Sequence, residues 1–416
     1  MNAPVAVLAV DGGDLALGGG LLAIARPALD LLEPGGVLAI LSSARSLRDD
    51  LPSWCRVERH EYLDRETLPD GRDRHLVRRG ALGVPRGGKA WGVPLPVHEG
   101  RLRAADLLAA SPMPEIADPH TGFAPRGARV EPGGPAYPFT LLEHVHVSPP
   151  EIGALYDQAV SAQWDPTTAI PWHTVRPLPP VLERAIGQVM GFLAENELSA
   201  LYVPARFLSR IHPAYTEVAQ LLATQMADEA RHIDVFLKRA RVSGGSPGVS
   251  SVTTARSLLS LMETADFTEA MFLLSVLGEG TFLDLLRFIE DHAPDEATAE
   301  LTRRARTDES RHVHFGLAHV RHALAHDASL YARLEAAVRR RAASLHGAGG
   351  VPHALQDALV VLAAGGDDPR TIAKGHDAFR ELLQTMDQGR RRRLEHAGFT
   401  AAQAATLSDL HTPNFM

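Results

Sequence analysis

A five-residue pattern with the chemistry of a metal site occurs twice in the second half of the chain. The run Asp228-Glu229-Ala230-Arg231-His232 recurs as Asp308-Glu309-Ser310-Arg311-His312. A glutamate and a histidine three residues apart on a helix project from the same face, with their Cβ atoms about 5–6 Å apart. Each copy can therefore supply one carboxylate and one imidazole to the same metal ion. A single Glu-x-x-His is weak evidence, but two copies inside one longer pattern, on apolar helices, are far more specific.

The aspartate and the arginine of each copy are expected to support its histidine. Asp228 and Asp308 each lie four residues before the histidine of their own copy, so each can accept the Nδ1 proton of that imidazole. This pairing would leave Nε2 free for a metal ion. Arg231 and Arg311 are expected to neutralise the surplus carboxylates, each by pairing with the aspartate of the other copy.

Two further carboxylates are expected from two other helices. Glu279 lies in the apolar run Leu277-Gly278-Glu279-Gly280-Thr281, where a charged side chain needs a partner. Glu197 shares a helical face with apolar residues, whereas Glu195 lies on a more polar stripe. We favour Glu197 as the ligand and keep Glu195 as the alternative or as a supporting residue. Carboxylate oxygens combined with imidazole nitrogens suit iron or manganese better than copper or a structural zinc.

The composition limits what kind of protein could carry this site. The 416 residues are enough for two or three domains of roughly 100–200 residues. The net charge of −8 argues against a nucleic-acid or anionic-lipid partner. The single cysteine, Cys55, excludes a disulfide within the chain and a four-cysteine cluster. Residues 1–14 lack the basic start of a secretory signal, and residues 15–25 are too few to span a bilayer, so we expect a cytoplasmic protein.

Helical periodicity dominates from residue 151 onward and carries all of the candidate ligands. Four long segments have apolar residues at three- and four-residue spacing, namely 177–211, 214–242, 250–292 and 294–326, with an expected break at 264–268. Further helices are expected over 332–345, 354–364 and 369–395. We therefore predict a helical bundle over residues 151–346 and a helical extension over 347–416.

The N-terminal 80 residues have a different pattern. Short apolar runs at 5–10, 37–41, 60–63 and 75–78 predict strands, and segments 21–32 and 46–54 predict helices. The order βαβαββ indicates a small two-layer sandwich over 1–80, so the whole chain is predicted to be a multi-domain α+β protein. Residues 81–150 are rich in proline and glycine, but aromatic residues recur among them, so we predict a linker that wraps against a neighbour: Trp91, Phe123, Tyr137 and Phe139.

Residues 177–326 resemble the ferritin-like superfamily, and in particular its O₂-activating di-iron carboxylate branch, whose members carry paired Glu-x-x-His helices. The resemblance implies two iron ions, or a manganese and an iron, held by Glu197, Glu229, His232, Glu279, Glu309 and His312. Three positions depart from known subfamilies. Phe236 stands where a radical-generating reductase subunit has a tyrosine. Leu283 stands where monooxygenases have a threonine, and Thr281 is offset from that position by half a turn. Ala305 stands where arylamine oxygenases have a third histidine.

The N-terminal residues are similar to TusA-type sulfur carriers in the runs 22–29, 33–38 and 50–55. These carriers hold sulfur on a cysteine at the start of the first helix, where this chain has Gly18-Gly19-Gly20-Leu21. The carrier cysteine is therefore missing, and Cys55 matches a different position, which we interpret as a buried packing residue. We expect a docking or dimerisation module rather than a sulfurtransferase.

The function expected from these features is O₂-dependent oxidation of a small organic substrate by hydroxylation, desaturation or N-oxygenation. No flavin or nicotinamide motif is visible, so a separate electron donor is expected. One alternative is a peroxide-reducing or iron-oxidising protein of the rubrerythrin or ferritin type. Another is a non-catalytic docking or sulfur-relay protein with a vestigial metal site. The sequence leaves the oligomeric state open, a homodimer included.

Overall fold

The computed structural model describes residues 5–80, 95–110, 112–128, 130, 133–345 and 351–411. The chain divides into two compact units, which are considered separately: Met1–Pro94 with Gly127–Pro135, and Leu95–Arg126 with Ala136–Met416. Trp91, one of the predicted linker aromatics, lies outside the described residues.

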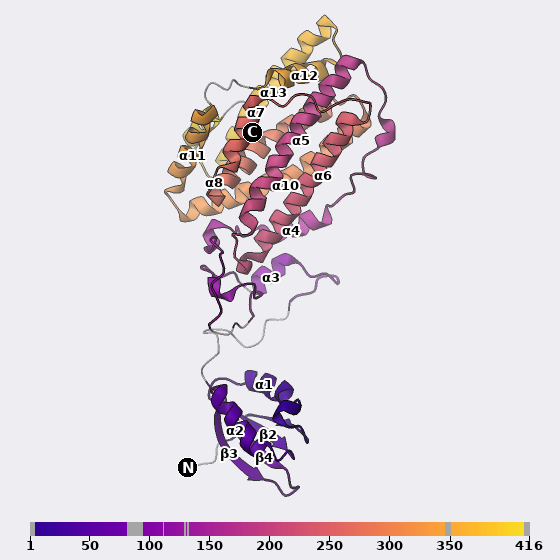
Figure 1. The fold of residues 1–416 in the computed structure, drawn as a ribbon. Coiled ribbons are helices and arrows are strands. Elements are labelled where there is room, and N and C mark those ends of the chain that lie inside the picture. Colours follow the sequence, from indigo (N-terminus) through magenta and orange to yellow (C-terminus); the bar gives the residue numbers. More distant parts are fainter. Residues whose placement is uncertain are drawn as a thin grey trace. The chain divides into compact units, whose positions relative to one another are not determined.

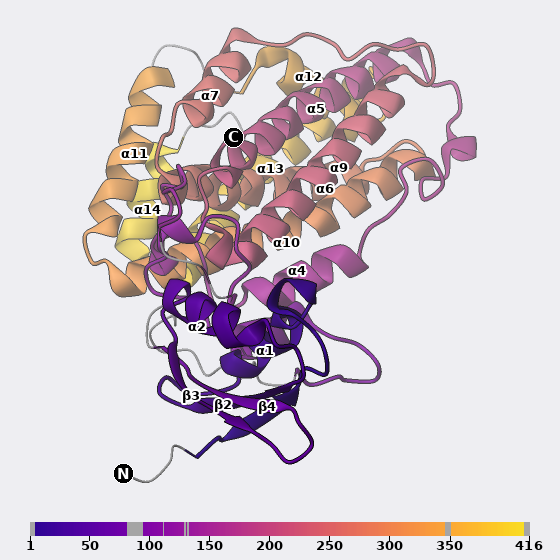
Figure 2. The ribbon, with the colours of Figure 1, turned by 60° about the horizontal axis from the view of Figure 1, so that its bottom comes forward.

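The first unit is built on a four-stranded mixed sheet (Figure 2). The strands β1 (Leu8–Asp11), β2 (Val37–Ser42), β3 (Glu61–Thr67) and β4 (Asp73–Arg78) lie in the order β1-β2-β4-β3, and only β1 and β2 are parallel. Helices α1 (Leu22–Asp30) and α2 (Leu47–Val57) share a core with one face of the sheet, to which Leu38, Ile40 and Val77 contribute. Alternate residues of the same strands point to the other face, as strand geometry requires. Cys55 is fully buried in this core.

The second unit is mainly helical, as predicted, and four helical segments of its described residues form the bundle that carries the candidate ligands (Figure 1). The bundle comprises α5 (Pro180–Leu208), α6 (Thr216–Arg241), a π-helical segment η6 (Phe272–Glu279) continuing into α9 (Gly280–Asp291), and α10 (Glu296–His326). Helix α5 packs along α6, and α10 packs along η6 and α9. Each helix buries an apolar stripe in one continuous core.

The third predicted segment, 250–292, is not one helix. It consists of α7 (Val252–Met262), α8 (Phe267–Met271), η6 and α9, so the expected interruption falls just before α8. The Asp266 side chain ends the break by accepting a hydrogen bond from the amide of Glu269. The π-helical turns were not predicted, because their shifted hydrogen bonding leaves no distinct apolar period in eight residues that are all buried.

The remaining described helices flank the bundle. They are α3 (Ala104–Ala110), α4 (Ile152–Ser161), α11 (Leu330–Leu345), α12 (His353–Ala364), α13 (Pro369–His396) and α14 (Ala401–Leu410). Helix α14 was not predicted from the sequence, although Thr400 and Gln403 form a reciprocal capping box at its start. Of the predicted linker, Ala117 and Val147 belong to the core of the second unit, and Phe123, Tyr137 and Phe139 contact one another through their rings.

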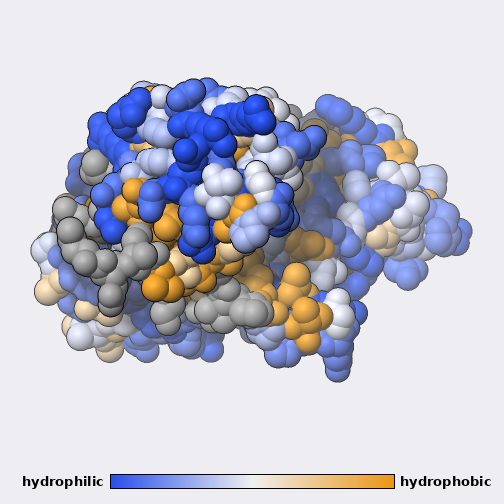
Figure 3. Space-filling model, turned by 90° about the horizontal axis from the view of Figure 1, so that it is seen from below, coloured by the Kyte–Doolittle hydropathy of each residue, from blue (hydrophilic) through white to orange (hydrophobic). Residues whose placement is uncertain are grey.

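The exterior is mostly hydrophilic on the face drawn in Figure 3, with hydrophobic residues gathered in separate patches. Phe123 is among the exposed apolar side chains, at 71%. Among the described helices, none has the length and apolarity needed to cross a bilayer.

Candidate metal centre

Six acidic and imidazole side chains meet inside the bundle of the second unit. Helix α5 supplies one, α6 two, η6 one and α10 two: Glu197, Glu229, His232, Glu279, Glu309 and His312. Each of these residues is at most 3% exposed. Burying so many ionisable groups is costly unless they are paired or bind metal ions. The cluster is therefore the strongest candidate for a functional site among the described residues.

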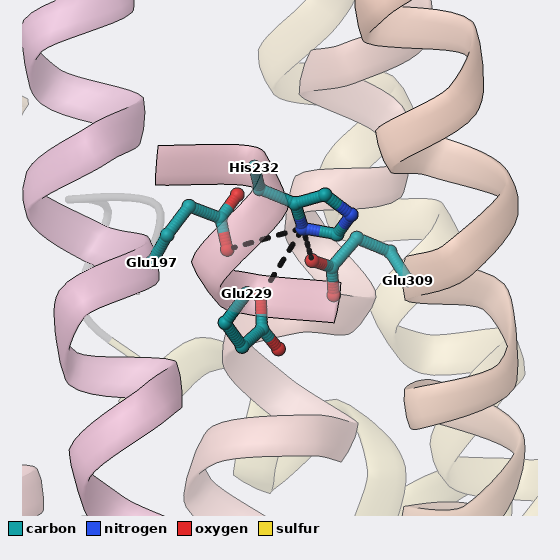
Figure 4. A group of neighbouring side chains, drawn as sticks. All are labelled: Glu197, Glu229, His232 and Glu309. Atoms are coloured by element: carbon teal, nitrogen blue, oxygen red, sulfur yellow. Dashed lines mark hydrogen bonds and ion pairs between the residues drawn. The ribbon is translucent and has the colours of Figure 1, made fainter. Parts of the chain in front are cut away.

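The six side chains form two adjoining groups that share two members. One group is Glu197, Glu229, His232 and Glu309, and the other is Glu229, Glu279, Glu309 and His312. Within each group, one ligand atom from every residue lies within 4.8 Å of the others. Figure 4 shows the first group, whose side chains converge from three helices, α5, α6 and α10. Since Glu229 and Glu309 belong to both groups, they are placed to bridge two metal ions.

The Nδ1 atoms of both histidines face the glutamates. His232 Nδ1 lies 3.2 Å from Glu229 Oε2, 3.3 Å from Glu309 Oε1 and 3.7 Å from Glu197 Oε2 (Figure 4). His312 Nδ1 lies 3.1 Å from Glu229 Oε1 and 3.4 Å from Glu309 Oε2. Nδ1 is thus the nitrogen available to a metal, whereas the sequence predicts this role for Nε2.

The aspartates pair with the histidine of the other helix, so the predicted same-helix pairing is wrong. His232 Nε2 lies 3.2 Å from Asp308 Oδ2, and His312 Nε2 lies 3.1 Å from Asp228 Oδ2. A helical side chain leans back over the preceding turn, which places Nδ1, the nitrogen nearer the backbone, beside the glutamate three residues earlier. The outer nitrogen, Nε2, then reaches across to the facing helix.

The two arginines neutralise the two aspartates as a group of four. Arg231 Nη2 bonds to Asp228 and lies 3.4 Å from Asp308 Oδ2. Arg311 Nη2 lies 2.6 Å from Asp308 Oδ1 and 3.2 Å from Asp228 Oδ2. Each arginine therefore contacts both aspartates, and not only that of the other helix as predicted. The positive charges of the two arginines cancel the negative charges of the two aspartates. The negative charge of the four glutamates must therefore be compensated by protons at the centre or by bound cations.

Three polar side chains at the centre were not assigned to it from sequence. Trp164 donates from Nε1 to Asp308 Oδ2 at 2.7 Å. Gln163 donates to Asp228 Oδ1 at 3.1 Å, and Gln225 donates to Glu279 Oε1 at 3.2 Å. Gln225 lies four residues before Glu229 on the same helical face, and this spacing was a signal that could have identified it.

Glu195, the alternative to Glu197, lies on another face of α5. Its Oε1 accepts a hydrogen bond from Ser250 Oγ at 2.6 Å, and it belongs to neither group of candidate ligands. Glu197, in contrast, is 2% exposed and faces His232. The structure therefore brings Glu197 to the centre and leaves Glu195 outside it, neither as a ligand nor as a supporting residue.

The electrostatics of the metal-free centre show how strongly it holds protons. Burial, together with the charges of Glu309 and Glu229, raises the pKa of Glu197 well above its usual value. Burial and the charge of Glu309 do the same to the pKa of Glu279. Burial alone would lower the pKa values of His232 and His312, but the carboxylates around them outweigh it and raise both pKa values well above the ordinary range. Protons on these groups thus compensate the negative charge of the carboxylates, as bound cations would.

Unpaired oxygen atoms test whether this donor set fits metal ions. Within the described residues, Glu197 Oε1 and Glu279 Oε2 have no hydrogen-bond partner. A buried polar atom left unpaired costs about 1–3 kcal/mol, and more when it is charged. Four carboxylates also match the charge of two divalent cations. The donor set of four carboxylates and two imidazoles therefore fits a pair of iron or manganese ions.

Comparison with known proteins finds only weak structural similarity. No family model matches the chain, and the search of curated proteins found no match either. An R2-like ligand-binding oxidase with an Fe/Fe cofactor is 18% identical over 59% of this chain and 92% of its own, with a TM-score of 0.48. A Mn/Fe form of an R2-like ligand-binding oxidase is 16% identical over 63% of this chain and 94% of its own, with a TM-score of 0.43.

Proposed function

We propose that this protein is a non-haem oxidase with a two-metal centre, Fe/Fe or Mn/Fe, that activates O₂ to oxidise a small organic substrate. The supporting observation is the pair of adjoining four-residue groups that share Glu229 and Glu309. A structural site needs only one closed ligand set, whereas two adjacent sites with bridging carboxylates suit chemistry that uses two metal ions together.

Different residues of the chain would bind each of the two metal ions of such a centre. Glu197 and His232 would hold one ion, Glu279 and His312 the other, and Glu229 and Glu309 both. When bound, the reduced metal pair supplies the electrons and the open coordination positions through which O₂ is activated. The protein supplies the geometry, and the crossed aspartate–histidine contacts fix the orientation of each imidazole ring.

Burial of the ligands would keep bulk water from this chemistry. All six are nearly inaccessible, and apolar residues such as Phe236 pack beside His232, with a ring-centroid distance of 6.3 Å. A dry site strengthens the electrostatic interactions within it and limits side reactions of an oxidant. Because Phe replaces a tyrosine at position 236, a stable tyrosyl radical there is not part of the proposed mechanism.

We further propose that electrons come from a separate protein or from the substrate, and that the first unit serves as a docking module. Burial raises the pKa of the Cys55 thiol to about 12, which suppresses the thiolate that sulfur transfer requires. The buried Cys55 supports the packing interpretation of this residue and disfavours a sulfur relay through it.

Metal content and O₂ reactivity test the proposed function. The full chain is expressed with iron, or with iron and manganese, and metal per chain is measured. It is then reduced without oxygen and mixed with O₂ in a stopped-flow spectrometer. About two metal ions per chain and a transient visible absorption are expected. Glu229→Ala should lose both signals while the fold is retained by circular dichroism.

The same experiment separates the alternatives. Iron far above two ions per chain would favour a storage protein. Failure to bind iron or manganese would overturn the proposal and favour a docking protein. Global unfolding of Glu229→Ala, with metal removal unfolding the wild type as well, would indicate a structural metal site.

A further inference from the structure

A second group of imidazoles lies on the outside of the helical unit, away from the metal centre. His322 and His326 occupy successive turns near the end of α10, and their ring centroids are 4.5 Å apart. His144, in the short helical turn His144–His146, has its ring centroid 5.9 Å from that of His322. His322 follows His312 by ten residues, or about 15 Å along the helix, so this group is distinct from the buried centre.

The orientation of the rings leaves nitrogen atoms available. His326 Nδ1 donates to the backbone carbonyl of His322 at 2.8 Å, which fixes the tautomer and leaves Nε2 with its lone pair. The His144 ring stacks on Tyr215, with a centroid distance of 5.9 Å and an interplanar angle of 17°. Tyr215 is itself held by a hydrogen bond from its hydroxyl to the carbonyl of Leu142, at 2.6 Å. The rings of His144 and His322 make no hydrogen bond to any other described residue.

The protonation state of the rings favours cation binding. Partial burial lowers the pKa values of His144 and His322, so both imidazoles are neutral at pH 7. Neutral imidazole is the form that binds metal ions. The carboxylates of Glu115 and Glu151 lie near enough to His322 to oppose this shift, and they add negative charge beside the rings.

We propose that His144, His322 and His326 form a binding site for a divalent transition-metal ion of the Zn²⁺ class. Histidines four residues apart on one helix face form a recurrent zinc-binding pair. With Zn–N bonds of about 2.1 Å, the ring centroids of two tetrahedral ligands lie about 5 Å apart. The separations of 4.5 and 5.9 Å between neighbouring rings fall on either side of this value. The three histidines are not among the described residues whose ligand atoms already lie within 4.8 Å of one another, so their rings must move toward one another to bind one ion.

Such an ion would link a loop to the bundle. The turn that carries His144 precedes α4, and the start of that helix already contacts α10 through an ion pair of 2.5 Å between Glu151 Oε1 and Arg321 Nη2. A metal ion on the three histidines would add a second link between the same two segments. The role proposed for the ion is therefore to fix the chain between His144 and Glu151 against α10.

Zinc titration of the metal-loaded protein tests this site. The full chain, with iron or manganese already in its buried centre, is titrated with Zn²⁺ by isothermal calorimetry, and its iron and manganese are measured before and after. One additional Zn²⁺ per chain is expected. His322→Ala and His144→Ala should each weaken this binding at least about tenfold. His376→Ala, which removes an exposed histidine of α13, is the matched control and should bind like the wild type.

Hydrogen exchange gives an independent measurement on the same samples. Zn²⁺ should slow amide exchange over residues 143–151 in the wild type but not in His322→Ala. The proposal is overturned if the wild type takes up no zinc beyond what displaces iron or manganese, or if both variants bind zinc as tightly as the His376→Ala control.

Discussion

His232 on α6 contacts Asp308 on α10 through its outer nitrogen, with 3.2 Å between Nε2 and Oδ2. The same contact recurs with the helices exchanged, between His312 Nε2 and Asp228 Oδ2 at 3.1 Å. In each histidine, Nδ1 therefore faces the glutamates, and Nε2 contacts an aspartate of the facing helix. The same four residues orient the candidate metal ligands and connect α6 to α10, so we expect stability and metal affinity to change together when one of them is altered.

Replacing Asp308 by asparagine should weaken metal binding about 10–100-fold, since loss of a carboxylate behind a ligating histidine has this effect. The amide keeps the shape of the side chain but removes the charge that His232 Nε2 and Trp164 Nε1 contact. Competition with a metal chelator of known affinity measures the change. Asp234→Asn is the control, because Asp234 lies on α6 and pairs only with the half-buried Lys238 among the described residues. Equal affinities of the two variants would contradict the prediction.

Glu197→Ala should reduce the metal content of the protein, whereas Glu195→Ala should retain two ions per chain. Glu197 is buried beside His232, whereas Glu195 bonds to Ser250 outside the centre. The two substitutions delete the same atoms two residues apart on α5, so they control for each other. Metal analysis after dialysis gives the result. A loss of metal in Glu195→Ala alone would show that the assignment is reversed.

The ligand residues were predictable from sequence because their signal is local. The repeated Asp-Glu-x-Arg-His run and the apolar face around Glu197 follow from helical spacing, and Glu279 stands out as a charged residue in an apolar run. The crossed pairing of Asp228 and Asp308 was not predictable, because it depends on how two helices far apart in sequence face each other.

Two further features were not predicted from the sequence, because they too depend on contacts between segments far apart in the chain. Trp164 reaches Asp308 across 144 residues, and a single tryptophan in the turn Trp164-Asp165-Pro166 gives no sign of such a contact. The π-helical turns of η6 replace an α-helix that the same apolar residues would also satisfy. These turns end at Glu279 and pack against α10, a contact between segments far apart in sequence.

Metal binding at pH 7 should release at least two protons per chain. The raised pKa values of His232 and His312 make both imidazoles cationic in the metal-free protein, and a metal ion can bind only their neutral forms. Apparent metal affinity should therefore fall as the pH is lowered. Calorimetric titrations in two buffers with different ionisation enthalpies count the protons. A heat of binding that is the same in both buffers would show that no proton is released.

Enlarging Gly316 should damage the metal centre without touching a ligand. A Cβ atom on Gly316 of α10 would lie 2.6 Å from the Cβ of Ser275 in η6, so a Gly316→Val substitution must push these two segments apart. Overpacking of this kind costs about 1–3 kcal/mol of stability. Since η6 carries Glu279 and α10 carries Glu309, the distance between the two carboxylates should change as well.

Thermal unfolding with and without metal measures both effects. The variant should unfold at a lower temperature than the wild type, and added iron should raise its unfolding temperature by less. Ala325→Val, at an exposed position of the same helix, should behave as the wild type does. An unchanged gain from iron in Gly316→Val would show that the close approach of the helices does not position the ligands.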